Sequence, residues 1–202
     1  MRRKRENKIF IGVDLQYGFV EGGGLPVQGG MKAALNAAKH LEKGKYDAVF
    51  LTRDWHPSNH CSFVENGGTW PIHCVQGTKD AEIVEEVLKA SPEAQVLNKG
   101  TKDNLEEYSA FGANKENLAK LTSVLSSDEN VINHVTLCGI AGDVCVLNTL
   151  KDLLDILPLN STIIIPIDSV ASLDEHHHTL IDFCQTHNAQ LGNEKKIEIF
   201  YY

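Results

Sequence analysis

Short apolar runs that alternate with longer amphipathic segments place the strongest constraint on the fold of this chain. The runs are rich in Val and Ile and are apolar at nearly every position, which is typical of parallel strands buried on both faces. They cover residues 8–15, 48–54, 94–100, 135–142 and 162–169. The segments between them carry apolar residues at helical spacing over residues 31–45, 80–90, 114–125 and 144–157. The alternation predicts an α/β chain with a three-layer, doubly wound fold around a central, mostly parallel sheet.

Both ends of the chain carry simpler patterns. Residues 195–202, KKIEIFYY, alternate between polar and apolar side chains, as expected for an edge strand with one exposed face. The basic residues 1–7 predict a flexible, solvated tail, because the apolar run behind them stops at Asp14 and is too short for a signal peptide or a membrane span. No linker or repeat divides the 202 residues, so we expect a single domain over residues 1–202.

Composition narrows the classes of partner. The net charge of −8 disfavours nucleic acid, because binding to a phosphate backbone depends on clustered Lys and Arg. The five cysteines lack CxxC spacing, which suits a reducing compartment better than a disulfide framework. We therefore expect a cytoplasmic protein that acts on a small molecule and has no nucleic-acid or membrane partner. The sequence leaves a homo-oligomer open.

Polar residues stand where three of the expected strands end. Asp14 closes the first strand, Lys99 closes the third, and Cys145 follows the fourth in the first turn of a helix. Taken singly, each has an ordinary explanation as a cap, a solvated lysine or a small buried residue. The carboxyl ends of parallel strands meet at one edge of a sheet, where ligands of doubly wound folds bind. Their convergence therefore favours a functional site.

A second group of polar residues predicts a metal site. Asp54 and His56 lie two residues apart in an extended segment, so both side chains point to the same side, and His60 and His73 follow in the loops behind them. Any one of these histidines alone could be a hydrogen-bonded loop or core residue. One carboxylate with three imidazoles suits Zn, Fe or Mn, so we expect one divalent ion, with Zn as the first choice. By contrast, the histidines at 176–178 are expected at a solvated helix start, since consecutive side chains diverge around a helix axis.

Five segments resemble the nicotinamidase/pyrazinamidase branch of the isochorismatase-like cysteine hydrolase family. They are VDLQYGFVEGGGLPVQGG, TRDWHPSNHCSF, TWPIHCVQGT, NKGTKDNLEEYSAFG and CGIAGDVCV, in that order, and the resemblance extends over nearly the whole chain. It implies a hydrolase that converts nicotinamide to nicotinate and ammonia and that also accepts pyrazinamide. Whether such an enzyme would serve NAD salvage or the degradation of an environmental amide is left open.

The resemblance divides the site into three groups of residues. The catalytic triad of the family corresponds to Asp14, Lys99 and Cys145. Its metal-contacting set corresponds to Asp54, His56, His60 and His73, of which His60 is the least uniform ligand in the family. Its aromatic pocket walls correspond to Phe19, Trp70 and Tyr108. Stacking on a flat substrate ring would suit these aromatic side chains, although simple core packing is an alternative explanation for Phe19 and Trp70.

The chemistry of the triad follows from the reactivity of a thiol. A cysteine with a pKa of about 8.5 is mostly protonated at neutral pH, so it needs activation before it can attack an amide. A helix N-terminus and the Lys99 ammonium would favour the thiolate, and Asp14 could take the thiol proton and later pass it to ammonia. We expect the backbone N–H groups of Ala141 and Cys145 to face the developing oxyanion. The resemblance also implies a cis peptide at Ile140–Ala141 and a metal that binds the ring nitrogen and orients the carboxamide.

Two other functions remain as alternatives. A related cysteine hydrolase could act on another amide and would not need the metal ligands, and a catalytically silent protein of the same fold could only bind a metal or a ligand. The presence of the whole triad favours an enzyme. One position departs from the family, because Gly18 stands where an acidic residue usually precedes Phe19, which removes a carboxylate that supports this loop. Gln16 is expected to brace the same loop.

Overall fold

The central sheet in the computed structural model, which describes residues 4–159, 161–191 and 195–201, confirms the predicted fold class. The described strands are β1 (Arg5–Val13), β2 (Ala48–Asp54), β3 (Gln95–Lys99), β4 (Val131–Ile140), β5 (Ser161–Pro166), β6 (Val170–Ala171) and β7 (Lys195–Phe200). Their order is β3-β2-β1-β4-β5-β7, with β6 pairing to the end of β4, and every strand pair is parallel. All of these strands belong to one sheet, which carries β7 at its edge as predicted.

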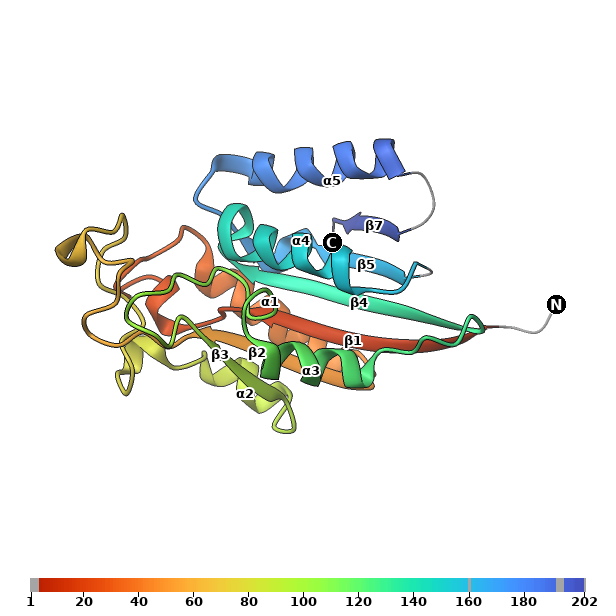
Figure 1. Cartoon of the computed structure of the whole chain (residues 1–202), viewed down its shortest axis with the longest axis horizontal. Coiled ribbons are helices and arrows are strands. Elements are labelled where there is room, and N and C mark those ends of the chain that lie inside the picture. Colours follow the sequence, from red (N-terminus) through yellow and green to blue (C-terminus); the bar gives the residue numbers. More distant parts are fainter. Residues whose placement is uncertain (1–3, 160, 192–194, 202) are drawn as a thin grey trace.

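Helices cover both faces of this sheet (Figure 1). They are α1 (Gly30–Lys43), α2 (Glu85–Ala90), α3 (Lys115–Val124), α4 (Leu147–Ile156) and α5 (His178–Leu191). Helix α1 packs against α2 on one face, whereas α3 and α4 lie over the other face, and α5 lies beside α4. Among the described residues, no helix has the length and apolar character needed to cross a bilayer.

Burial on both faces of the central strands explains why their sequences are apolar throughout. The β1 residues from Ile9 to Val13 are all buried, as expected for a strand covered by helices on either side. Helix α1 turns small residues toward the sheet, among them Ala33, Ala34 and Ala37, and these let the helix pack closely. Asn114 caps α3 by accepting hydrogen bonds from the backbone N–H groups of Glu116 and Asn117, both at 3.1 Å.

The connection order places a crevice at the ends of β1 and β4. The chain runs from β1 outward through β2 to β3, then crosses back so that β4 pairs with the other side of β1. Such a reversal in strand order is the place where doubly wound sheets bind ligands. Asp14 follows β1 directly, and Ala141 follows β4 directly, so both residues stand at this reversal.

The ends of several elements differ from their predicted positions. Strand β1 begins at Arg5, so residues 5–7 pair with β4 and do not belong to a tail, and residues 1–3 lie outside the described part of the chain. The helix predicted over residues 80–90 is shorter, because a 3₁₀ turn at Lys79–Ala81 precedes α2. Strand β4 begins four residues before the expected start, because residues 131–134 pair with residues 5–8 at the start of β1.

The histidines at 176–178 also differ from the prediction. Helix α5 begins at His178, but His176 and His177 precede it with left-handed φ angles of 62° and 58°. The His177 ring is half-buried, and its Nδ1 lies 2.7 Å from the hydroxyl of Ser172. Only His178 therefore belongs to the helix start, and His177 helps to hold the loop before it.

The close approach of β1 and β4 generates a prediction about stability. Gly139 has φ of 133°, and a Cβ atom at this position would lie 2.0 Å from the carbonyl oxygen of Val13. Gly139→Ala should therefore lower the free energy of unfolding by about 3 kcal/mol or more, through overpacking and backbone strain together. Gly22→Ala is the matched control, because Gly22 also has positive φ, of 92°, but has nothing within 4 Å of the added Cβ.

Urea unfolding of both variants measures the difference. We expect Gly22→Ala to cost only about 1–2 kcal/mol, which is the strain of a left-handed residue without a clash. Equal losses in the two variants would contradict the close approach at the strand ends.

Candidate active site

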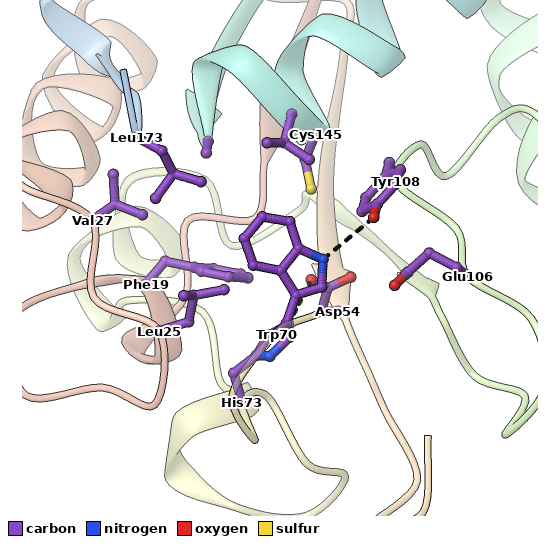
Figure 2. Close-up of a pocket in the computed structure, with 12 residues that line it drawn as sticks. Phe19, Leu25, Val27, Asp54, Trp70, His73, Glu106, Tyr108, Cys145 and Leu173 are labelled. Atoms are coloured by element: carbon purple, nitrogen blue, oxygen red, sulfur yellow. Dashed lines mark hydrogen bonds and ion pairs between the residues drawn. The ribbon is translucent and has the colours of Figure 1, made fainter. Parts of the chain in front are cut away.

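A pocket opens at the reversal between β1 and β4, and most of the predicted site residues reach it. Phe19, Trp70, Tyr108, Ala141 and Cys145 all line its wall. Figure 2 shows the Cys145 sulfur pointing into the pocket, with His73 at the opposite end and Asp54 between them. The empty space in the pocket, including the part that is open to solvent, is about 390 Å³. The centre of a water-sized sphere can occupy only about 30 Å³ of it, so the pocket suits a small, compact ligand.

The buried ammonium of Lys99 joins the predicted triad. Its Nζ lies 2.8 Å from Asp14 Oδ2 and 3.6 Å from Cys145 Sγ. Lys99 also forms an ion pair with Asp54 Oδ1, so a single ammonium contacts two carboxylates and the sulfur. Thr52 donates its hydroxyl to the other Asp14 oxygen at 2.7 Å, which fixes the orientation of that carboxylate. The structure thus brings together Asp14, Lys99 and Cys145 as predicted from the strand ends.

The pKa values of all three groups are raised, for different reasons. Burial raises the pKa of Asp14 to about 6, although the Lys99 ammonium opposes the shift. Burial also raises the pKa of the Cys145 thiol well above its usual range, and Lys99 offsets this only in part. The pKa of Lys99 is raised well above its usual value, because Asp14 and Asp54 outweigh the effect of burial. The raised pKa favours a Cys145 thiol beside a carboxylate that can accept its proton, and Lys99 is the group that favours the thiolate.

The turn that carries Cys145 is wider than the predicted first turn of an α-helix. Residues Gly142–Val146 form a π-helical turn, and α4 continues from it. Single π-turns are frequent at functional sites. The peptide between Ile140 and Ala141 is cis, as the resemblance implied. Ala141 and Cys145 both line the pocket, so their backbone can approach a ligand held there.

Asp54 also forms a cluster with two histidines on the side away from Lys99. His56 Nε2 lies 3.6 Å from Asp54 Oδ2, and His73 Nε2 lies 3.9 Å from the same oxygen. His56 Nδ1 lies 2.9 Å from the Gly100 carbonyl oxygen, and His73 Nδ1 lies 2.7 Å from that of Pro71. A carbonyl oxygen only accepts, so each Nδ1 donates. Each Nε2 then faces Asp54, where it donates to the carboxylate if the ring is protonated and has a free lone pair for a metal if the ring is neutral.

The cluster has the chemistry of a divalent metal site. One oxygen and two imidazole nitrogens with their second nitrogens fixed by carbonyls are the donors that Zn, Fe and Mn accept. The three donor atoms lie within 4.8 Å of one another. Ligands at about 2.05 Å from a tetrahedral ion are about 3.3 Å apart, so these donor atoms would draw closer together to hold an ion. Although burial would raise it, the pKa of Asp54 is held well below its usual range by Lys99, His56 and His73, so its carboxylate is charged.

His60 does not offer a free nitrogen to this cluster, contrary to the prediction of a fourth ligand. Its Nδ1 accepts from the backbone N–H of Ser62 at 3.2 Å, so its Nε2 carries the proton and donates to the Leu105 carbonyl at 3.0 Å. The His60 ring stacks on His56, with ring centroids 4.1 Å apart. The sequence spacing correctly placed His60 beside the cluster, but the turn rotates its ring so that both nitrogens bond to protein.

Aromatic side chains line the space between the sulfur and the histidines. The Trp70 indole donates to the Tyr108 hydroxyl at 3.3 Å, so these two rings hold each other in place (Figure 2). Phe19 is buried, and its ring centroid lies 5.5 Å from that of His73 in a tilted arrangement. The three predicted aromatic residues thus share one pocket, and Phe19 packs into the core as well.

The Gln16 side chain holds the backbone of Asp54. Its side-chain amide accepts from the Asp54 N–H at 2.8 Å and donates to the Asp54 carbonyl at 2.8 Å and to the Ala81 carbonyl at 2.9 Å. Gln16 is fully buried, so these hydrogen bonds are shielded from water. The brace that we expected from Gln16 is present, and it acts on the end of β2 as well as on the loop after β1.

Sequence reasoning missed several residues of the pocket. Glu106 lies on the wall beside Tyr108, and burial raises the pKa of its carboxyl. It could have been found, because it stands two residues before Tyr108, and such residues point to the same side of an extended segment. Glu107 accepts the Gly100 N–H at 2.9 Å and so supports the carbonyl that holds His56. Leu173 also lines the pocket, but no local sequence signal marks it.

Comparisons with known proteins agree with this geometry. Residues 8–191 match the Isochorismatase domain family. The chain is 34% identical to a nicotinamidase of Acinetobacter baylyi, over 86% of each protein. It is 35% identical to a nicotinamidase/pyrazinamidase of Mycobacterium tuberculosis, over 72% of this chain and 77% of that protein.

A solved structure has the same fold and a similar sequence. It is a pyrazinamidase of Pyrococcus horikoshii in complex with zinc, with a TM-score of 0.75 and 32% identity. The match covers 96% of this chain and 99% of that chain. By sequence and by structure, this chain belongs to the isochorismatase domain family.

Proposed function

We propose that this protein is a metal-dependent nicotinamidase, which hydrolyses nicotinamide to nicotinate and ammonia and also accepts pyrazinamide. The observation that carries the proposal is a small pocket lined by Cys145, Asp54 and His73, behind which a buried ammonium contacts the sulfur and two carboxylates. The second oxygen of Asp54 faces His56 and His73. Relatives that are 34% and 35% identical bear the names nicotinamidase and nicotinamidase/pyrazinamidase. A further structure with the same fold, from L. infantum, is in complex with nicotinate, with 27% identity and a TM-score of 0.74.

Substrate orientation follows from the two ends of the pocket. Asp54, His56 and His73 would hold one divalent ion, Zn as the first choice and Fe or Mn as alternatives, and that ion supplies a Lewis acid that binds the pyridine nitrogen. Phe19 and Trp70 flank the flat ring from the pocket wall. The carboxamide then lies at the Cys145 end, where the reaction takes place.

Attack by the thiol begins with a proton transfer. Asp14 takes the proton of Cys145, and the sulfur forms a bond to the carboxamide carbon, whose carbonyl oxygen becomes an oxyanion. The backbone N–H groups of Ala141 and Cys145 would donate to that oxyanion. Lys99 remains charged and limits the cost of the negative charge on the sulfur during attack. A pKa of about 6 suits Asp14 to this exchange at neutral pH.

Release of ammonia and hydrolysis of the thioester return the enzyme to its starting state. Asp14 gives its proton to the amide nitrogen as the C–N bond breaks, so ammonia leaves and a thioester on Cys145 remains. Water then attacks the thioester carbon while Asp14 takes one of its protons. The C–S bond breaks, and Asp14 returns the proton to the sulfur. The carboxylic acid that is formed loses its remaining proton to solvent and leaves as nicotinate.

Removal of the nucleophile should abolish turnover. We expect Cys145→Ala to lower ammonia release from nicotinamide by at least ~10³-fold, because the pocket of the variant has only water as a nucleophile, in place of the thiol. Cys61→Ala is the matched control, since Cys61 does not line the pocket, and it should leave the rate within a factor of about two. Retention of turnover in Cys145→Ala with a folded protein would favour a silent or differently acting homologue.

Removal of the metal should also abolish nicotinamide turnover. Protein stripped with a chelator is expected to lose activity and to regain it on addition of Zn, Fe or Mn, because the ring nitrogen loses its partner. Full activity in verified metal-free protein would support the alternative of a cysteine hydrolase with another amide substrate, which has no need of the ion.

The two histidines should differ in their effect on metal affinity. We expect His73→Ala to weaken Zn binding by 100-fold or more, because a direct ligand is lost. His60→Ala should change Zn affinity far less, while it lowers the free energy of unfolding by about 1–3 kcal/mol through the unpaired Leu105 carbonyl and Ser62 N–H. Titration against a chromophoric chelator measures both affinities. Equal losses in the two variants would show that His60 is a ligand after all.

A further inference from the structure

Asp80 bridges the two loops that form the pocket wall. Its Oδ1 accepts the backbone N–H of Gly24 at 2.9 Å, and its Oδ2 accepts the backbone N–H of Cys74 at 2.7 Å. Gly24 belongs to the loop after β1, whereas Cys74 belongs to the loop between β2 and α2. One half-buried carboxylate therefore ties together segments that are 50 residues apart in the sequence.

Each of these loops contributes side chains to the proposed site. The loop after β1 carries Phe19 and Leu25, and the Leu25 N–H donates to the Gly18 carbonyl at 2.9 Å. The other loop carries His73, directly before Cys74. The distance between the aromatic wall and this histidine thus depends on what holds the two loops together.

The carboxylate of Asp80 fits tightly against the backbone of both loops. A Cβ atom added at Gly18 would lie 2.9 Å from Asp80 Oδ2, and one added at Gly24 would lie 3.0 Å from the same oxygen. Cys74 has a left-handed φ of 47°, a conformation that persists only where its surroundings hold it. Its hydrogen bond to Asp80 is one such restraint. Asp80 thus supplies a carboxylate next to position 18, where this chain has no side chain.

The turn that carries Asp80 is also connected to Asp54, the third residue of the proposed metal cluster. Asp80 lies in the 3₁₀ turn Lys79–Ala81, and the Ala81 carbonyl accepts from Gln16 at 2.9 Å. Gln16 in turn bonds to the backbone of Asp54 on both its N–H and carbonyl sides. The turn therefore has contacts that lead to Phe19, to His73 and to Asp54.

We propose that Asp80 is a positioning residue, which sets the loop of Phe19 and the loop of His73 in one geometry and so tunes metal affinity and ring binding. This inference rests on the proposed function for the metal and the ring. The carboxylate of Asp80 is essential to the role, because its two oxygens accept from two N–H donors at once. An asparagine has only one acceptor oxygen and would turn its NH₂ group toward the other N–H. Asp80 touches neither the ring nor the ion and acts through Gly24 and Cys74.

The test compares Asp80→Asn and Asp80→Ala with the control Asp155→Asn. Asp155 is exposed at the end of α4 that lies farthest from Cys145, so its substitution leaves the pocket unchanged. For both Asp80 variants we expect Zn affinity about 10-fold weaker, as for other residues that orient metal ligands. We also expect a KM for nicotinamide about 10-fold higher, with kcat changed much less. Thermal unfolding of each variant reports whether the fold is intact.

Hydrogen exchange provides a measurement that needs neither the metal nor the substrate. In Asp80→Ala, peptides that cover residues 18–27 and 72–78 should exchange faster than in the wild type, because the N–H groups of Gly24 and Cys74 lose their acceptor. Unchanged exchange in both peptides would overturn the bridge. Zn affinity and KM equal to those of Asp155→Asn would overturn the positioning role, even if the melting temperature falls. If the wild type fails to bind Zn or to hydrolyse nicotinamide, the proposed function fails, and hydrogen exchange alone then decides whether Asp80 joins the loops.

Discussion

The buried ion pairs of Lys99 are the interactions on which the rest of the site depends. A fully buried ammonium is held between Asp14 and Asp54, and both carboxylates are buried as well. Burial of these charges is costly, and it is tolerated only because each has a close partner of opposite sign. Loss of one partner from such a group typically costs about 3–5 kcal/mol, so these residues are fixed by stability as well as by chemistry.

Asp54 connects the two ends of the pocket because its two oxygens have different partners. Oδ1 pairs with Lys99, whereas Oδ2 faces His56 and His73. The Cys145 sulfur and the histidine cluster are therefore linked by one chain of charged contacts through Lys99 and Asp54. The sheet makes this possible, because Asp54 and Lys99 are paired in register at the ends of β2 and β3. Parallel pairing thus places the carboxylate and the ammonium side by side, and Gln16 in the loop after β1 holds the Asp54 backbone in addition.

Much of this site could be predicted from the sequence because strand ends are set by local pattern. The apolar runs end at Asp14, Asp54 and Lys99, and in a parallel sheet such ends share one edge. Ring orientation and protonation could not be predicted in the same way. The tautomer of His60 and the thiol state of Cys145 both depend on neighbours that only the folded chain supplies, namely the Leu105 carbonyl and the burial of the sulfur.

Residues that act through the backbone of distant loops were the hardest to foresee. Asp80 reads in the sequence as an ordinary acidic residue before a short helix, and its contacts with Gly24 and Cys74 arise only from tertiary structure. Leu173 likewise reaches the pocket from the segment after β6 without any motif. By contrast, Gly18 was visible as a position without a side chain, and the structure shows the Asp80 carboxylate beside it.

Trapping of the covalent intermediate is the most direct test of the proposed thiol mechanism at Cys145. Metal-replete protein would be mixed with nicotinamide, quenched in acid during turnover, digested and analysed by mass spectrometry. We expect a nicotinoyl group on the peptide that contains Cys145, formed as ammonia is released and lost as nicotinate appears. Ammonia release with an unmodified Cys145 peptide throughout, at quench times shorter than one turnover, would contradict the thiol mechanism. A protein that binds metal and yet releases no ammonia would contradict the assignment of nicotinamide as its substrate.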